Sequence, residues 1–310
     1  MDQFHLMNVY VAVAEEEGFA AASRRLRLSA PAVTRAVAEL EDKLGVKLLN
    51  RTTRYVRTTD AGVRYLEDAR RILHDIELAN EAAIGINAEP KGHLSITAPV
   101  LFGQKYIMPG IMEYLKTYPN TYVDAVFLDR VVNLLEEGFD IGIRIGELPD
   151  STMRAKQVGK VRLVLVASPG YITEYGIPNG PDDLTKHTLV SSSAGSMPQD
   201  WQFIENEKKQ TLRVKPRLTV TTNQAAINAA KEGLGITRVL SYQVADELAN
   251  GHLKIMLSDF ELPSVPIHII HRESHLSSNK VRSFIDLMAE RLKKDESLHG
   301  VKQRWHCATP

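Results

Sequence analysis

Basic residues gather in one short stretch of a chain that is otherwise balanced in charge. The sequence contains 38 Lys and Arg and 38 Asp and Glu, yet residues 18–58 hold nine basic residues against three acidic ones. Such a cluster neutralises phosphates and releases counterions, which supplies most of the sequence-independent affinity for nucleic acid. The stretch is therefore a candidate nucleic-acid interface, with a solvated surface of incidental charge as the alternative. The basic residues are Arg24, Arg25, Arg27, Arg35, Lys43, Lys47, Arg51, Arg54 and Arg57.

Two short helices are predicted within this stretch. In the first, Phe19, Ala22 and Leu26 recur at helical spacing and form one apolar face. Gly18, just before them, ends a preceding helix that begins near Phe4.

The second helix has clear start and stop signals. Ser29 is a natural N-cap, because its hydroxyl can accept a hydrogen bond from a first-turn amide. Pro31 sits in that first turn, where a missing N–H costs nothing, and Gly45 ends the helix. Four apolar residues at intervals of 4, 3 and 4 seat it on a core, namely Val33, Val37, Leu40 and Leu44.

The opposite face of this second helix combines short side chains with one long donor. Thr34 and Arg35 lie near the helix start, with Ala30 and Ala38 beside them. Small side chains permit close approach to a major groove, where the first turns of a recognition helix touch base edges. A compact basic hairpin over residues 46–62 follows. Scaffold helix, turn, recognition helix and wing, in this order, predict a winged helix-turn-helix.

These residues resemble the N-terminal domain of LysR-type transcriptional regulators. That pattern runs from an alanine-rich second helix through Ser-x-x-x-Val-[Ser/Thr]-Arg and Leu-Glu-x-x-Leu-Gly to a Leu-[Leu/Phe]-x-Arg wing ending in Thr-x-x-Gly. The chain departs from it at Gly18, where the family usually has a capping Ser, and at Thr34, where it favours Ser. The matching segments are Ala20-Ala21-Ala22, Ser29, Val33-Thr34-Arg35, Leu40-Glu41-Asp42-Lys43-Leu44-Gly45, Leu48-Leu49-Asn50-Arg51 and Thr59-Asp60-Ala61-Gly62.

The expected macromolecular partner is a double-stranded DNA operator. Thr34 and Arg35 should reach base edges, while Ser29, Arg51 and Arg54 should hold phosphates. The full set of expected DNA-binding residues is Ser23, Ser29, Pro31, Thr34, Arg35, Arg51 and Arg54.

A long helix should follow the wing, capped by Thr59 and stopped near Ala88 by Glu89, Pro90 and Gly92. It carries an a/d seam of about three heptads, the pattern of a helix that pairs with another. Because a second half-site adds specificity, we expect a homodimer or homotetramer, as the resemblance also implies. Packing against the helix's own domain is the alternative. The seam comprises Gly62, Leu66, Ala69, Leu73, Ile76, Asn80 and Ala83, and the residues expected to dimerise are Leu66, Leu73, Ile76 and Asn80.

From Lys91 the pattern changes to alternating strands and helices, which predicts βαβ units and a mostly parallel sheet. Two α/β halves, with chain crossings near Gly159 and Pro266, are similar to the two-lobed, periplasmic-binding-protein-like (type 2) effector domain of LysR-type regulators. The fold class is therefore α/β with an N-terminal winged helix-turn-helix and a long linker helix. Strands are expected at 92–99, 121–128, 139–146, 162–169, 235–239 and 265–272, and helices at 104–116, 131–138, 225–233, 242–250 and 278–293.

The expected domains follow from these elements. They are the DNA-binding domain at 1–58, the linker and dimerisation helix at 59–89, and the effector-binding domain at 90–300, with lobe I at 91–158 and 267–294 and lobe II at 159–266.

A two-lobed layout places a ligand between the lobes, outside the carboxyl ends of strands and near helix N-termini. Arg144 ends a predicted strand and either pairs internally, with Glu147 or Asp140, or meets an anion. Free amides near Thr222 would face the same cleft. We therefore expect a small polar effector, a carboxylate rather than a bulky hydrophobe. The candidate effector-binding residues are Thr97, Val100, Phe102, Arg144, Glu147, Trp201, Thr222 and Asn223, each with a cap or core role as the alternative.

Other functions find little support in the sequence. Without a Gly-x-Ser-x-Gly, a Walker loop or a Gly-x-Gly-x-x-Gly after a strand, we expect no catalytic residues and no cofactor. His268, His271 and His275 invite a metal site, but the first two fall on opposite faces of one strand, so none is expected. No apolar run could span a membrane, and the single cysteine, Cys307, cannot form an intrachain disulfide, which fits a cytoplasmic protein.

The predicted function is a ligand-responsive transcriptional regulator that resembles the LysR type. The alternative is a solute-binding or enzymatic α/β module with an N-terminal interaction domain.

Overall fold

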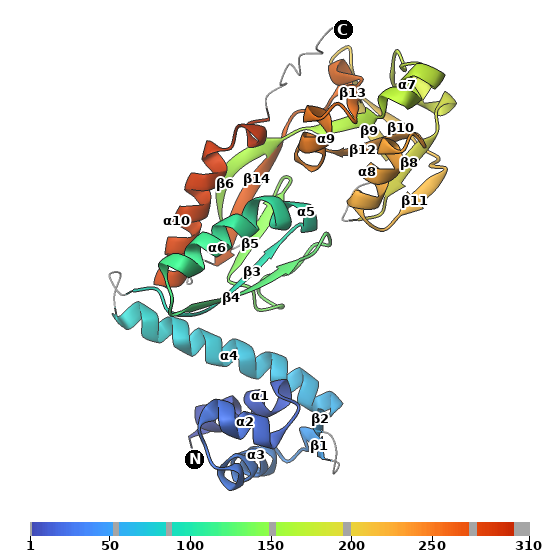
Figure 1. The fold of residues 1–310 in the computed structure, drawn as a ribbon. Helices are drawn as coiled ribbons and strands as arrows, with labels where there is room; N and C mark the ends of the chain where they lie inside the picture. The colour runs from blue at the N-terminus through green and yellow to red at the C-terminus, as the bar shows by residue number, and fades with distance from the viewer. Residues whose placement is uncertain are drawn as a thin grey trace. The chain divides into compact units, whose positions relative to one another are not determined.

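The computed structural model describes residues 2–51, 56–84, 89–148, 153–194, 200–272 and 278–300 (Figure 1). The chain divides into two compact units, Met1–Ala88 and Glu89–Pro310.

The N-terminal unit has the predicted winged helix-turn-helix. Strands β1 and β2 pair antiparallel as the wing, with Leu49 opposite Thr58. The unit consists of α1 (Gln3–Glu15), α2 (Phe19–Leu26), α3 (Ala30–Leu44), β1 (Leu49–Arg51), β2 (Val56–Thr58) and α4 (Asp60–Ile84).

The predicted caps of α3 are present. The Ser29 hydroxyl accepts the Ala32 amide at 3.4 Å, and Gly45 ends the helix at φ +67°. Val33, Val37 and Leu40 are fully buried, as predicted, but Leu44 is 38% exposed. The expectation that Leu44 seats the helix is wrong, because the helix ends there and the residue lies at the margin of the core.

The junction between the wing and α4 is tightly built. The Thr59 hydroxyl caps α4 by accepting the Gly62 amide at 2.9 Å, as predicted. A Cβ at residue 62 would lie 2.1 Å from the Leu48 carbonyl oxygen, so only glycine fits there. The Tyr10 hydroxyl donates to the Gly62 carbonyl at 2.7 Å and joins α1 to the same junction.

Helix α4 covers its own unit with part of the predicted seam. Ala69 is fully buried in the N-terminal core, and Leu66 and Leu73 pack against that core while remaining partly exposed. The helix is described as far as Ile84, and the predicted end near Ala88 lies outside the described residues.

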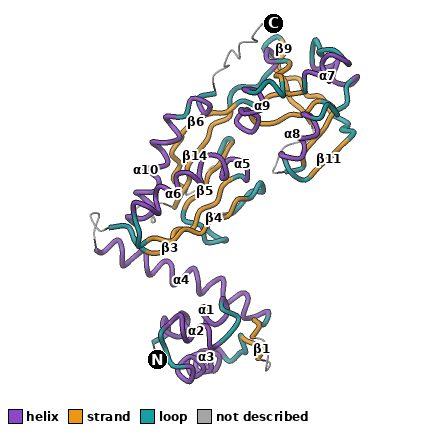
Figure 2. The backbone as a smooth tube through the Cα atoms, viewed as in Figure 1, coloured by secondary structure: helices purple, strands orange, loops and turns teal. Residues whose placement is uncertain are grey.

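The C-terminal unit contains two five-stranded sheets (Figure 2). The first, in the order β4-β3-β5-β14-β6, belongs to lobe I, and the second, in the order β11-β8-β12-β7-β13, belongs to lobe II. The expected mostly parallel sheet is wrong, because each sheet has two parallel and two antiparallel strand pairs. The first sheet comprises β3 (Gly92–Ala98), β4 (Thr121–Phe127), β5 (Ile141–Ile145), β6 (Met153–Val161) and β14 (Val265–Arg272); the second comprises β7 (Leu163–Ala167), β8 (Leu189–Ser192), β11 (Leu218–Val220), β12 (Ile236–Leu240) and β13 (Lys254–Met256).

A separate antiparallel hairpin, β9 (Asp200–Glu205) and β10 (Lys208–Arg213), packs in lobe II. The sequence did not predict it, nor strand β6. The two lobes meet where the chain crosses between sheets: β6 continues to Val161, so the crossing lies at Arg162, three residues beyond Gly159. The return crossing lies just before Val265, next to the predicted Pro266.

Helices flank the two sheets. The predicted helix at 131–138 is wrong: Asn133 caps a single turn by accepting the Leu135 amide at 3.1 Å, and Gly138 ends it at φ +73°. The helical segments are α5 (Val100–Phe102), the π-helical η1 (Gly103–Ile107), α6 (Met108–Thr117), α7 (Pro169–Tyr175), α8 (Asn223–Lys231), α9 (Ala245–Ala249), α10 (Asn279–Lys294) and the 3-10 turns η2 (Pro181–Lys186), η3 (Ser241–Val244), η4 (Ser258–Phe260) and η6 (Glu296–Leu298).

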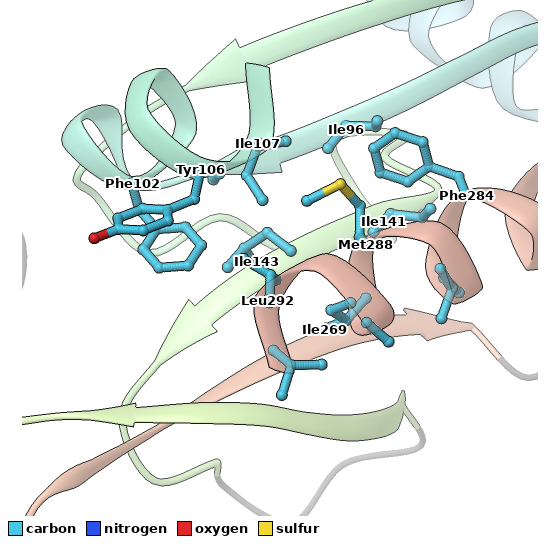
Figure 3. Close-up of a cluster of buried hydrophobic side chains, with 14 of the residues drawn as sticks. Ile96, Phe102, Tyr106, Ile107, Ile141, Ile143, Ile269, Phe284, Met288 and Leu292 are labelled. Atoms are coloured by element: carbon cyan, nitrogen blue, oxygen red, sulfur yellow. The ribbon is translucent and has the colours of Figure 1, made fainter. Parts of the chain in front are cut away.

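The lobe I core joins the sheet to α6 and α10. Figure 3 shows Ile96, Ile141 and Ile143 facing Phe284 and Met288 of α10. Each of these side chains is fully buried, which removes apolar area worth about 25 cal/mol per Å² from water.

Candidate functional sites

The exposed face of α3 carries the residues expected to read bases. Thr34 and Arg35 are both exposed. Within the part of the chain that the structure describes, the side chain of Arg35 forms no hydrogen bond or ion pair. The other basic residue of α3, Lys43, is paired with Glu39 at 3.1 Å. Arg35 is therefore the free cation of this helix.

The basic stretch divides into paired and unpaired residues. Arg25 pairs with Glu15 at 2.7 Å, and Lys47 pairs with Glu41 at 2.7 Å. Internal pairs of this kind leave less charge for phosphates than the sequence count suggests. The arginines without an ion pair among the described residues are Arg24, Arg27, Arg35 and Arg57. The side chain of Arg51 and all of Arg54 lie outside the described residues.

Two predicted contact residues also stabilise the turn between α2 and α3. The Ser23 hydroxyl donates to the Leu28 carbonyl at 2.8 Å, and Ser29 caps α3. Pro31 is exposed in the first turn of α3.

Glu41, part of the motif that carried the resemblance, ties α3 to the wing. Its carboxylate is buried and accepts the amides of Leu48 at 3.0 Å and Leu49 at 3.1 Å, besides the Lys47 ammonium. Burial raises the pKa of Glu41, but these hydrogen bonds outweigh it, so the net pKa is lowered. This role of Glu41 was not predicted from the sequence.

A cavity lies in lobe II between the β9–β10 hairpin and the second sheet, where β8 ends. It encloses roughly 570 Å³, part of it open to solvent. Two predicted effector residues, Trp201 and Asn223, line it together. The remaining lining residues are Leu163, Ser191, Ser192, Asp200, Gln202, Arg238 and Leu262.

Arg238 of β12 is the cation of this cavity, and it was not predicted from the sequence. Its guanidinium lies 5.9 Å from the Trp201 ring and 5.4 Å from the Phe203 ring. It donates one hydrogen bond, to the Gln202 carbonyl at 3.0 Å. Burial lowers the pKa of Arg238 to about 10. An Arg on an otherwise apolar strand, Ile-Thr-Arg-Val-Leu, was the available signal.

The other predicted effector residues do not line this cavity. Thr97 is fully buried at the end of β3, and its hydroxyl has no hydrogen-bond partner among the described residues. The Val100 amide donates to Asp129 at 3.0 Å. Glu147 is exposed beyond β5, and Thr222 caps α8 by accepting the Ala225 amide at 3.3 Å.

Phe102 lies in a buried aromatic cluster between the lobes. Its ring centroid lies 4.9 Å from that of Tyr106 and 5.2 Å from that of Tyr242, which belongs to lobe II (Figure 3 shows the first pair). Lys105 and Asp246 add an ion pair of 2.7 Å across the same boundary. Because Phe102 is fully buried, its ring offers no surface to a ligand in this conformation.

Arg144 adopts neither of the predicted ion pairs. It is half-buried on β5, donates to the Val132 carbonyl, and has no carboxylate partner among the described residues. Asp140 instead accepts the Ser95 amide at 2.9 Å. Burial lowers the pKa of Arg144, and the nearby Glu137 only partly offsets this.

Over the described ranges, no three His, Cys, Asp or Glu side chains come together as a metal site; His275 and Cys307 fall outside those ranges. None of the described helices combines the length and apolar character needed to traverse a bilayer.

Comparison with known proteins gives the family. Residues 4–63 match the bacterial regulatory helix-turn-helix protein, lysR family, and residues 87–293 match the LysR substrate binding domain. The HTH-type transcriptional activator AaeR of Escherichia coli K12 is 31% identical over 306 residues, covering 97% of this chain and 98% of that protein.

Solved full-length structures are similar over most of the chain. CrgA, a LysR-type transcriptional regulator from Neisseria meningitidis, gives a TM-score of 0.61 at 27% identity, covering 93% of this chain and 98% of that one. The Vibrio cholerae virulence activator AphB gives a TM-score of 0.62 at 25% identity, covering 93% and 99%.

LysR-type regulators bind DNA operators and small-molecule effectors and form oligomers. The chain belongs to this family: it is a DNA-binding transcriptional regulator with an effector-binding domain, and not an enzyme.

Proposed function

We propose that α3 reads operator bases through Thr34 and Arg35, while Ser29, Arg51 and Arg54 hold phosphates, with Ser23 and Pro31 close to the DNA. The observation that carries this proposal is the free, exposed Arg35 on a helix whose other basic residue is paired. The guanidinium of an arginine can bind a guanine edge with two hydrogen bonds, whereas a lysine in an ion pair must first separate from its carboxylate partner.

The test is operator affinity, measured by fluorescence anisotropy on DNA upstream of the protein's own gene. Arg35→Ala should weaken specific binding by about 1–3 kcal/mol and relax base preference at one position. Arg51→Ala should weaken all sequences alike and reduce the salt slope by about one.

Lys43→Ala is the matched control, because it removes a paired cation from the same helix. It should leave operator preference unchanged. Unchanged operator affinity when Thr34 and Arg35 are both replaced by Ala would refute the base-reading assignment.

We also propose that α4 pairs two copies of the chain as a homodimer or within a homotetramer, through Leu66, Leu73, Ile76 and Asn80. Leu66 and Leu73 keep exposed surface after packing on their own unit, Ile76 is half-buried outside that core, and Asn80 is exposed. The free part of the seam therefore lies toward Ile76 and Asn80.

Charged substitution of the seam should split the assembly, because a buried unpaired charge is strongly unfavourable. Ile76→Lys alone should suffice, and it spares the N-terminal core that Leu73→Glu would also disturb. Sedimentation and the DNA footprint are the measurements. An intact oligomer for Ile76→Lys combined with Leu73→Glu would exclude this seam.

The effector that we propose is small and polar, and it binds the C-terminal unit. Two arginines support an anion: Arg144 in lobe I and Arg238 in lobe II, neither with a carboxylate partner among the described residues. A cytoplasmic location accompanies this function, since a regulator must reach the chromosome.

A further inference from the structure

We propose that the lobe II cavity beneath the β9–β10 hairpin binds a small carboxylate with an apolar body, and that Arg238 holds the carboxylate. This inference rests on the proposed function, because it assigns the chemical class of the effector and one residue that recognises it.

The charge of Arg238 is not neutralised by a carboxylate among the described residues. A guanidinium carries five N–H donors, and among the described residues Arg238 uses one of them, on the Gln202 carbonyl. The buried acid near it, Glu261, is already held by Arg162 through two hydrogen bonds of 2.8 and 2.5 Å. Asp200 also lines the cavity, but it is exposed and forms no ion pair with Arg238 among the described residues. The cation is therefore left with donors for an incoming anion.

Two aromatic rings hold the Arg238 guanidinium in position. Trp201 and Phe203 contact the guanidinium with their rings, and cation–π contacts of this kind hold a planar cation in place. Arginine is also the side chain that matches a carboxylate with two parallel hydrogen bonds. A site fixed before binding loses less entropy when the ligand arrives.

The other lining residues offer hydrogen bonds and apolar surface to a ligand. Ser191, Ser192 and the Asn223 amide can add hydrogen bonds, and the Ser192 oxygen accepts the Ala194 amide, which leaves its hydrogen free to donate. Leu163 and Leu262 supply apolar surface beside the Trp201 ring. Six of the nine lining residues carry polar or charged groups, and small-molecule sites combine apolar surface with polar groups that converge on the ligand.

A purely structural role for Arg238 is the alternative. The hydrogen bond to Gln202 and the two ring contacts could serve only to fasten the hairpin to β12. That role predicts no preference of the cavity for an anion.

The test is calorimetry on the full-length protein with acetate, hexanoate and phenylacetate, each beside its neutral amide. Hexanoate or phenylacetate should bind about tenfold or more tighter than its amide, since hydrogen bonds to charged groups contribute this much. Arg238→Gln should weaken carboxylate binding by roughly tenfold to a hundredfold and leave amide binding unchanged. Arg238→Lys should retain part of the preference, because it keeps the charge and loses the fork.

Arg217→Gln, an exposed arginine of the same lobe outside the cavity, is the control and should bind like the wild type. Equal affinity of the wild type for acid and amide, or no binding by any carboxylate of the panel, would overturn the site without relying on a variant. If acetate bound as tightly as the larger acids, the proposal that the ligand has an apolar body would be refuted. If the wild type did not bind its operator DNA specifically, the proposed function would be refuted instead. The calorimetric result on the cavity would stand independently.

Discussion

The buried ion pair at the lobe crossing should be among the most sensitive interactions of the C-terminal unit. Arg162 and Glu261 are joined by two hydrogen bonds of 2.8 and 2.5 Å, and their side chains are only 8% and 7% exposed. At an effective dielectric of about 20, two unit charges about 4 Å apart interact by about 4 kcal/mol. Removing one partner of a buried pair typically costs about 3–5 kcal/mol, because the remaining charge is uncompensated. We therefore expect Glu261→Gln to destabilise this unit by about 3–5 kcal/mol.

Urea unfolding followed by the fluorescence of Trp201, which is buried in the same lobe, is the assay. Glu205→Gln, an exposed carboxamide substitution on β9, is the control and should change stability by less than about 0.5 kcal/mol. Replacing Arg162 with Met and Glu261 with Leu together should cost less than either single change, because no buried charge remains. A loss below about 1 kcal/mol for Glu261→Gln would refute the reasoning, since it would place the pair in the range of exposed ones.

Two further predictions concern the N-terminal unit. Gly62→Ala should destabilise it by about 1–3 kcal/mol, because the new Cβ meets the Leu48 carbonyl oxygen at 2.1 Å and backbone must shift; thermal unfolding measures this, and an unchanged midpoint would contradict it. Glu41 has a lowered pKa in the folded protein, so its stabilisation is complete above the ordinary pKa of a glutamate and is lost as pH falls through the folded pKa. Glu41→Gln should lower stability at neutral pH and make the acid loss shallower, seen by circular dichroism between about pH 3 and 7; parallel pH profiles for both proteins would exclude this role.

The N-terminal unit could be predicted closely because local chemistry decides its structure. Ser29, Gly45 and Thr59 each cap or end a helix through a bond to a neighbouring residue, and a sequence pattern records such bonds directly. Strand β14 was predicted at its observed bounds because a run of eight residues rich in Val and Ile is typical of a buried strand.

The parts that could not be predicted depend on contacts distant in sequence. The antiparallel pairing of β14 with β5 and β6 is set by how the chain crosses between the lobes. The residue pattern along one strand cannot predict this direction. The β9–β10 hairpin turns at Asn206 and Glu207, both at positive φ, and a Glu there hides the usual Asn-Gly signal. The aromatic surroundings of Arg238 depend on that hairpin, because it places Trp201 and Phe203 over β12.

The Glu41 carboxylate has a consequence for how the protein selects DNA. By holding the first residues of the wing strand at the C-terminal part of α3, it makes the helix and the wing strand one rigid body. If α3 enters the major groove as proposed, its depth there and the approach of the wing strand to the neighbouring DNA backbone cannot be adjusted separately. A DNA whose groove width fits α3 but not the wing strand, or the reverse, must bend in order to bind. Part of the discrimination between DNA sequences then depends on the stiffness of the duplex and not on its base edges.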